Sequence, residues 1–401
     1  MSWEKVRLGD VTDSCLGKML DQEKNKGDYH PYLANVNVRW GSFDLENLPQ
    51  MRFEDDEQER YGLKYGDLII CEGGEPGRCA IWKNEIPNMK IQKALHRVRV
   101  HDCLDYRYLF YWFLWAGKRG ALEQYFTGAT IKHMPGQKLK SVIIDKPPIE
   151  TQRRIADILS AYDALIENNR KQIKLLEEAA QRLYKEWFVD LRFPGQEHTK
   201  IVDGVPEGWE TLHISDVCDT IGGGTPSTKV KEYYQNGRIP WVTPTDITKN
   251  NSLVLLDTAT KITNEGLNAS SAKMVPPGTI LMTSRASVGF FGICDFSVCT
   301  NQGFICCIPY QSNMQMYLLY NLLNRVDEIR GKAGGSTYLE ISKKVFRDFE
   351  VVVPDSPFLT LFQITTEKFI EQTKILSKQI LILQQARDRL LPKLMSGEVK
   401  V

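Results

Sequence analysis

Hydrophobic and polar residues follow two different patterns along this chain. Short runs rich in Val, Ile, Tyr and Phe, bounded by Gly, Pro and Asn, are typical of β-strands. These runs occupy residues 67–71, 95–100, 278–283 and 303–308. Residues 106–126 and 314–330 have the apolar spacing of helices instead. Each half of the chain is therefore expected to form an α+β domain with a twisted β-sheet and helices.

Two longer segments repeat apolar residues with a period of seven, and each follows a helix-start signal. Pro147-Pro148 precedes the first, and Asp355-Ser356-Pro357 precedes the second. A helix of roughly 35 residues spans about 50 Å, too long for one small domain to cover. We therefore expect the two helices to pack together as an antiparallel coiled coil, rather than each on its own domain. The predicted seam consists of Ile155, Leu159, Tyr162, Ile166, Ile173, Leu176, Leu183, Phe362, Phe369, Leu376, Ile380, Leu383 and Leu390.

The second half of the chain repeats the first at an offset between 206 and 212 residues. Trp3-Glu4 recurs as Trp209-Glu210, and the two helical seams share one register at an offset of 207. Two copies of a domain followed by a helix predict a pseudo-two-fold arrangement, with one globular domain at each end of a helical rod. The expected segments are 1–147, 148–190, 191–354 and 355–401, alternately a globular domain and a helix.

Charge and cysteine usage narrow the class of protein. The net charge of +1 requires a nucleic-acid binder to segregate its positive charge or to share it with partner subunits. Residues 86–100 are basic without an acid, although taken alone such a run is better explained as a solvated surface. The nine cysteines lack paired spacing, which favours buried free thiols in a reducing compartment over a metal site or disulfides. With no signal segment or membrane span in the sequence, we expect a cytoplasmic protein.

Catalytic and metal-binding motifs are missing from the sequence. Residues 222–227 (GGGTPS) lack the Gly-Lys-Ser/Thr ending of a phosphate-binding loop, and the six histidines have no metal-ligand spacing. Pro147-Pro148 lacks the flanking residues of an adenine-methylating motif. We therefore expect no catalytic residue, no metal and no cofactor on this chain.

Four segments resemble the specificity subunits of type I restriction-modification enzymes. They are PPIETQRRI at 147–155, LYKEWFVDLRFPG at 183–195, VPEGWE at 205–210 and LLPKLMSGEV at 390–399. Their order along the chain and the internal repeat make this resemblance specific. The start of the second helix departs from the pattern, because Asp355-Ser356-Pro357 carries extra residues and lacks the Glu-Thr-Gln form.

The resemblance implies two target recognition domains separated by two conserved antiparallel helices. It implies a chain that reads a bipartite site on double-stranded DNA, each domain reading one half-site while the helices set the gap. It also implies two methyltransferase subunits and, for restriction, two motor-nuclease subunits as partners. S-adenosylmethionine, ATP and Mg²⁺ would then bind those partners and not this chain.

Candidate DNA-contacting residues are polar side chains in loops at equivalent positions of the two copies. They are Arg78, Lys93, Arg97, Lys132, His133, Thr225, Ser227, Thr243, Thr245, Ser284, Arg285, Ser287, Gln302, Ser336, Thr337 and Tyr338. Arg78 and Arg285 are the strongest single candidates, because arginine pairs with guanine through two hydrogen bonds. Ordinary turn or surface roles are the alternative for each of them.

Two other classes of protein are compatible with parts of this pattern. A stand-alone DNA-binding regulator with two similar domains would need stronger basic character than this composition has. A methyltransferase fused to its own reader would need the cofactor and catalytic motifs that the sequence lacks.

Overall fold

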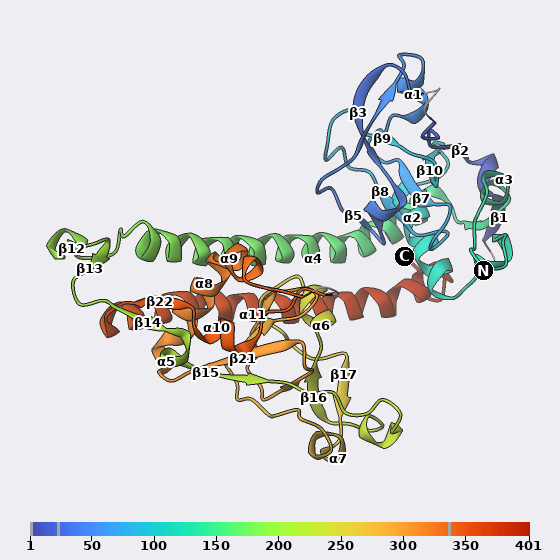
Figure 1. The fold of residues 1–401 in the computed structure, drawn as a ribbon. Coiled ribbons are helices and arrows are strands. Elements are labelled where there is room, and N and C mark those ends of the chain that lie inside the picture. Colours follow the sequence, from blue (N-terminus) through green and yellow to red (C-terminus); the bar gives the residue numbers. More distant parts are fainter. Residues whose placement is uncertain (1–2, 22–24, 336–337) are drawn as a thin grey trace. The chain divides into compact units, whose positions relative to one another are not determined.

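Two compact units make up the chain in a computed structural model that describes residues 3–21, 25–335 and 338–401. Unit 1 consists of residues 1–165 and 383–401, and unit 2 consists of residues 166–382 (Figure 1). Each unit contains one globular part and one end of each long helix. Within the described residues, no helix is long and apolar enough to cross a membrane.

Unit 1 is built on three small sheets. The largest has the strand order β2-β10-β7-β8, a second has the order β6-β3-β9, and β1 pairs with β11. The strands are β1 (Glu4–Arg7), β2 (Thr12–Leu16), β3 (Asp28–Leu33), β6 (Gln50–Phe53), β7 (Leu68–Cys71), β8 (Cys79–Ile81), β9 (Lys90–Ile91), β10 (Leu95–Val100) and β11 (Ile143–Lys146), with the hairpin β4 (Val38–Arg39) and β5 (Ser42–Phe43). The helices are α1 (Glu57–Tyr61), α2 (Tyr106–Lys118) and α3 (Gly136–Lys140), and α4 (Ile149–Tyr184) begins in this unit.

Unit 2 has the same arrangement in the second half of the chain. Its sheets have the orders β15-β21-β18-β19 and β17-β16-β20, and β14 pairs with β22. The strands are β14 (Glu210–His213), β15 (Cys218–Gly222), β16 (Ile239–Val242), β17 (Thr260–Ile262), β18 (Ile280–Thr283), β19 (Phe291–Gly292), β20 (Cys299–Thr300), β21 (Phe304–Pro309) and β22 (Glu350–Val353), with the pair β12 (Ile201–Val202) and β13 (Val205–Pro206). The helices are α5 (Ile214–Val217), α6 (Pro244–Thr248), α7 (Asn264–Asn268), α8 (Gln315–Asn324), α9 (Val326–Gly331), α10 (Lys343–Arg347) and α11 (Ser356–Met395).

Strand pairing repeats residue by residue between the two units. Leu95 pairs with Cys71 in unit 1, and Phe304 pairs with Thr283 in unit 2. These partners are related by the offsets of 209 and 212 residues, inside the range that the sequence comparison gave. The predicted duplication is therefore confirmed in the fold, and so is the α+β class of each copy.

The predicted helical stretch 106–126 is wrong in its extent. Helix α2 ends at Lys118, and Gly120 follows with a φ of 71°, a left-handed conformation that terminates helices. The stretch 314–330 is likewise divided, because α8 ends at Asn324 and α9 begins at Val326.

The long helices run antiparallel to each other within each unit. In unit 2, Asn169 Nδ2 donates to Gln379 Oε1 at 3.2 Å, and the rings of Tyr184 and Phe362 lie 6.2 Å apart. In unit 1, the Arg387 guanidinium contacts the carboxylate of Asp163. All thirteen predicted seam residues are buried or half-buried.

Both helix segments form part of the unit cores. In unit 2, Ala180 of α4 and Phe362 of α11 belong to one apolar cluster with Tyr317 of α8 and Met282 of the four-stranded sheet. Helix α8 therefore contacts both that sheet and the helix pair through this cluster. Each compact unit thus contains a globular part together with the helix ends that pack on it. The predicted segments instead divide the chain between globular domain and helix after residues 147, 190 and 354.

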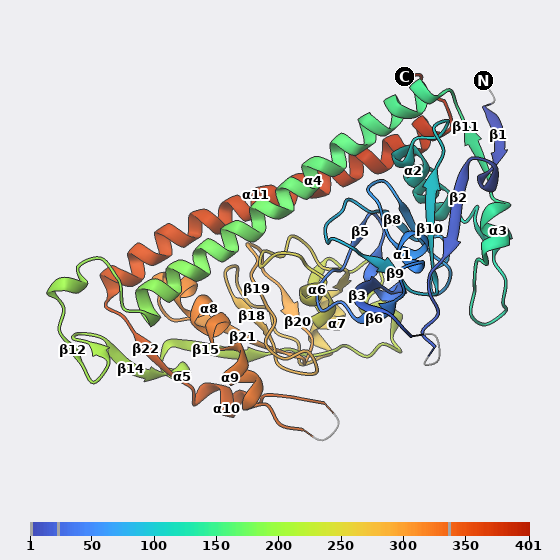
Figure 2. The same cartoon turned by 90° about the horizontal axis from the view of Figure 1, so that it is seen from above.

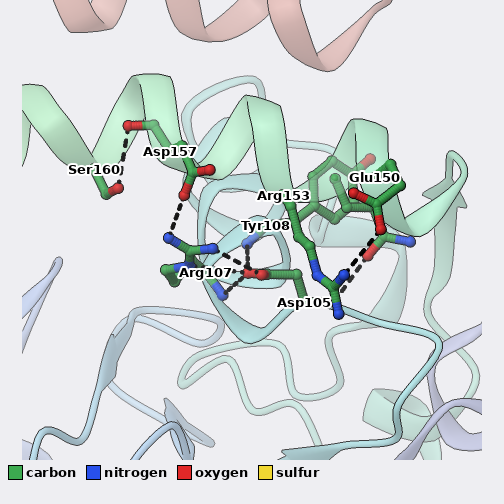
Figure 3. A network of polar contacts seen from close by, with 8 residues as sticks. Asp105, Arg107, Tyr108, Glu150, Arg153, Asp157 and Ser160 are labelled. Atoms are coloured by element: carbon green, nitrogen blue, oxygen red, sulfur yellow. Dashed lines mark hydrogen bonds and ion pairs between the residues drawn. The ribbon is translucent and has the colours of Figure 1, made fainter. Parts of the chain in front are cut away.

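A polar network fastens α2 to the start of α4 in unit 1 (Figure 3). Asp105 caps α2, accepting from the backbone N–H groups of Arg107 and Tyr108 at 2.8 and 3.2 Å. The Arg107 guanidinium bridges Asp105 and, on α4, Asp157 at 3.0 and 2.6 Å. The side chain of Asp105 is 9% exposed, and that of Asp157 is 64% exposed. We therefore expect the buried cap of α2 to contribute more stability than the exposed Arg107–Asp157 pair that joins α2 to α4.

Replacing the two carboxylates separately should reveal this difference. Asp105→Ala removes a helix cap and leaves Arg107 half-paired, so we expect a loss of about 2 kcal/mol in the free energy of unfolding. Asp157→Asn removes only an exposed ion pair and should cost at most about 1 kcal/mol. Urea unfolding followed by circular dichroism measures both. Equal losses for the two variants would contradict the larger contribution expected of the cap.

Candidate DNA-binding interface

Three loops of unit 1 meet at the end of its four-stranded sheet. They are residues 72–78 after β7, residues 92–94 before β10, and the hairpin 127–133 between α2 and α3. The amide of Glu72 donates to Ala94 O at 2.9 Å, and the amide of Met134 donates to Glu72 O at 2.7 Å. We call these residues the three-loop cluster of unit 1.

Unit 2 contains the same cluster, formed by residues 284–289, residues 301–303 and a hairpin whose described residues are 334–335 and 338–340. The amide of Ser284 donates to Gly303 O at 2.8 Å, and the amide of Ile341 donates to Ser284 O at 3.0 Å. Ser284, Gly303 and Ile341 correspond to Glu72, Ala94 and Met134 at offsets of 212, 209 and 207 residues. The two bonds of unit 2 are therefore the counterparts of the two bonds of unit 1. Figure 2 shows the described residues of this hairpin, after α9, extending away from the sheet.

The loops after β7 and β18 also share an unusual backbone conformation. Gly77 and Gly289 have φ angles of 90° and 81°, and their amides donate to Cys71 O and Thr283 O at 3.0 and 2.9 Å. Gly74 corresponds to Ala286, which has a φ of 61°. A left-handed conformation costs a residue with a Cβ on the order of 1 kcal/mol, so the surrounding contacts hold this loop in place.

Lys93, Lys132 and His133 lie together on the cluster of unit 1, and all three are exposed. The backbone of His133 bridges that of Gly73, so its ring lies against the loop after β7. Behind the hairpin, burial lowers the pKa of His96, whose Nε2 lies 3.0 Å from Met134 O. A neutral His96 therefore donates from Nε2 and supports the base of the hairpin.

Arg78 lies at the end of the same loop but points inward. Its side chain is 18% exposed, and its guanidinium donates to Glu75 Oε2 and to Asn35 O, both at 3.1 Å. These contacts fix the loop and leave little of the guanidinium for a base. The preference for Arg78 as a leading base reader is therefore not supported by its position.

Arg97 is separated from the cluster altogether. It is 8% exposed, and its Nη1 donates to the carbonyl oxygens of Glu59, Arg60 and Gly62 at 2.9, 2.8 and 3.2 Å. This geometry closes the end of helix α1. This position gives Arg97 a structural role in the unit and does not support the prediction that it contacts DNA.

Arg285 and Tyr338 are exposed on the cluster of unit 2. Arg285 Nε lies 3.6 Å from Glu340 Oε2, and both side chains are about half-exposed. Such a pair contributes little, so the guanidinium can exchange its partner. Ser287 is half-buried beside it, whereas Ser284 is buried under the hairpin and cannot reach a ligand as placed. Ser336 and Thr337 lie outside the described residues.

The remaining predicted residues of unit 2 are Gln302, which belongs to the cluster, and Thr225, Ser227, Thr243 and Thr245. Thr225 donates its hydroxyl hydrogen to Gln302 Oε1, and both residues are exposed. The glycine-rich loop before Thr225 packs on the backbone, since a Cβ on Gly223 would lie 2.1 Å from Asn301 O. Thr243 is the N-cap residue of α6, and its backbone N–H and its hydroxyl donate to Asp246 Oδ2 at 2.8 and 2.7 Å. Ser227 and Thr245 are exposed.

Exposed apolar side chains on the hairpins include two, Ile131 and Leu339, that are absent from the residues predicted to contact DNA. They are 64% and 50% exposed, and the predicted Tyr338 beside Leu339 is 61% exposed. Tyr338 is the counterpart of Ile131 at an offset of 207, so the internal repeat could have identified Ile131 as a candidate. Apolar groups at this position can contact the methyl group of thymine.

The cluster and its surroundings contain no group of residues suited to metal binding, within the ranges 3–21, 25–335 and 338–401. Burial raises the pKa of Cys71 to about 11 and that of Cys306 to about 12. These thiols therefore stay protonated at neutral pH and are poor ligands or nucleophiles.

Comparison with known proteins gives a consistent result. Residues 1–178 and 206–379 match the family described as the type I restriction modification DNA specificity domain. The chain is 29% identical to the type I restriction enzyme MjaIX specificity subunit of Methanocaldococcus jannaschii, over 84% of this chain and 78% of that protein. It is 26% identical to the HindI specificity subunit of Haemophilus influenzae, over 99% of both chains.

A solved structure has a similar fold. The S subunit of a type I restriction-modification system from M. genitalium aligns with a TM-score of 0.59 and 17% identity, covering 98% of this chain and 96% of that one. That likeness supports the fold, while the sequence matches cover both halves of the chain. This chain therefore belongs to the type I restriction-modification DNA specificity domain family and contains two copies of its domain.

Proposed function

We propose that this chain is a DNA-reading specificity subunit in which each unit recognises one half of a bipartite target. The observation that carries the proposal is the three-loop cluster, which recurs with the same backbone hydrogen bonds in both units. Two separate clusters of one design favour two short recognised sequences over a single continuous one.

The side chains of the cluster suit contacts with DNA. Arg285 can donate two hydrogen bonds to guanine, and Gln302 can pair with the edge of adenine. Lys93 and Lys132 are exposed cations suited to phosphate, which fixes position without reading sequence. Ile131 and Leu339 offer apolar contacts. Each cluster thus combines positioning and reading groups.

We further propose that partner subunits supply the catalysis. The chain itself would be non-catalytic, acting in the cytoplasm with two methyltransferase subunits and, for restriction, two motor-nuclease subunits. S-adenosylmethionine, ATP and Mg²⁺ would bind those partners. The helices of unit 2 offer a surface for such partners, because Leu175, Leu361, Ile364, Ile375 and Ile382 are apolar and each is 44% exposed or more.

Arg285→Ala tests the reading role directly. If the guanidinium reads guanine, discrimination at one base pair of the half-site read by unit 2 should fall by roughly 1–3 kcal/mol, with the other half-site unchanged. Binding of the assembled complex to a panel of single-base variants of the target measures this. The control is Glu340→Gln, which removes the ion-pair partner and leaves Arg285 in place. Equal weakening on unrelated DNA would instead identify a phosphate contact.

Lengthening both helices tests whether they set the gap. Seven residues inserted after Asn168 and seven after Gln379 keep the seam pairing and add about 10 Å, or about three base pairs at 3.4 Å each. We expect the unspecified gap of the methylated site to grow by that amount while both half-sites stay the same. Four-residue insertions, which break the seven-residue register, serve as the control. A change in the recognised bases would contradict the spacer role.

A further inference from the structure

Unit 1 contains a pocket of about 760 Å³ where α4 begins and the segment after α11 passes. Its lining includes Trp3, Cys103, Pro148, Thr151, Val399 and Lys400. None of these residues belongs to the three-loop cluster. The proposed DNA-reading function therefore leaves the pocket without a role.

The internal repeat identifies the counterpart of this pocket in unit 2. The amide of Arg192 donates to Glu186 O at 2.8 Å after α4, and the amide of Val399 donates to Lys393 O at 3.1 Å after α11. The two donors, Arg192 and Val399, are related by an offset of 207, and so are the two acceptors, Glu186 and Lys393. The same offset relates Phe193 to Lys400 and Phe358 to Thr151, and an offset of 206 relates Trp209 to Trp3.

In unit 2, aromatic side chains fill the corresponding space. The ring of Phe193 lies 5.1 Å from that of Trp209 and 5.0 Å from that of Phe358. Phe193 is only 4% exposed, so it is enclosed by its neighbours. Thr151 and the exposed Lys400 replace two of the three aromatic residues in unit 1, and Trp3 stays half-buried at the pocket.

We propose that this pocket binds an aromatic side chain from a proline-containing segment of a different protein, as Phe193-Pro194 does within unit 2. The charged lining residues Glu4, Lys146 and Lys400 have mixed signs, so we expect the aromatic ring rather than charge to determine binding. A second copy of this chain is a poor donor of Phe193, because that side chain is buried in its own unit. The pocket is thus an interaction site separate from DNA reading.

Alkylation of Cys103 provides a direct test, because this exposed thiol lines the pocket. The probe is the peptide Asp-Leu-Arg-Phe-Pro-Gly-Gln, which copies residues 190–196. At about 1 mM, a weakly binding peptide should slow iodoacetamide labelling of Cys103 at least threefold in the full chain, measured by mass spectrometry. The same peptide with Ala in place of Phe should have no effect. Unchanged labelling with the Phe peptide would overturn the proposal.

Thr151→Trp supplies an independent test by placing an aromatic side chain where unit 2 has Phe358. We expect at least tenfold weaker binding of the fluorescein-labelled peptide, measured by anisotropy. Arg154→Trp, a substitution at an exposed position of the same helix, should bind it as the unmodified chain does. Equal binding by both variants would overturn the proposal, as would a dimer of this chain that Thr151→Trp dissociates. If Thr151→Trp does not fold, the Cys103 measurement decides alone.

Discussion

A short backbone ladder between three loops is the interaction on which the recognition surface depends. In each unit, the loop after β7 or β18 accepts a backbone hydrogen bond from the residue that follows the hairpin. The same loop donates a backbone hydrogen bond to the turn before β10 or β21. These bonds hold residues such as Ala286 in a strained left-handed conformation. Because the ladder is made by the backbone, side chains at the surface can change without changing the loop geometry. A family of readers can vary its targets on such a frame.

The same separation of frame and surface explains what the sequence could predict. The seven-residue repeat and the shared offset of 207 predicted the helix pair, since apolar periodicity reports burial directly. The strand runs at 67–71 and 278–283 were likewise readable. Helix ends were less so: α2 stops at Lys118 because of one glycine conformation.

Side-chain roles at the interface were the hardest to predict. Arg78 and Arg97 occur in basic, loop-rich sequence like Lys93, yet both guanidinium groups bond to the protein itself. Backbone carbonyls brought close only by the fold, Asn35 O for Arg78 and those of residues 59, 60 and 62 for Arg97, accept these bonds, so no spacing in the sequence reveals them. Arg285 instead is itself half-exposed and lies beside the half-exposed carboxylate of Glu340. The exposed hairpin side chains Ile131 and Leu339 escaped notice because apolar residues were assigned to the core.

The central claim is that two copies of one loop frame read two separate half-sites. Mapping of methylated adenines by single-molecule sequencing, in cells that express this chain with the proposed methyltransferase partner, tests it most directly. The account predicts a motif of two short specified blocks separated by a gap of fixed length and unspecified sequence, absent when this chain is omitted. A single continuous motif, or methylation that persists without this chain, would contradict it.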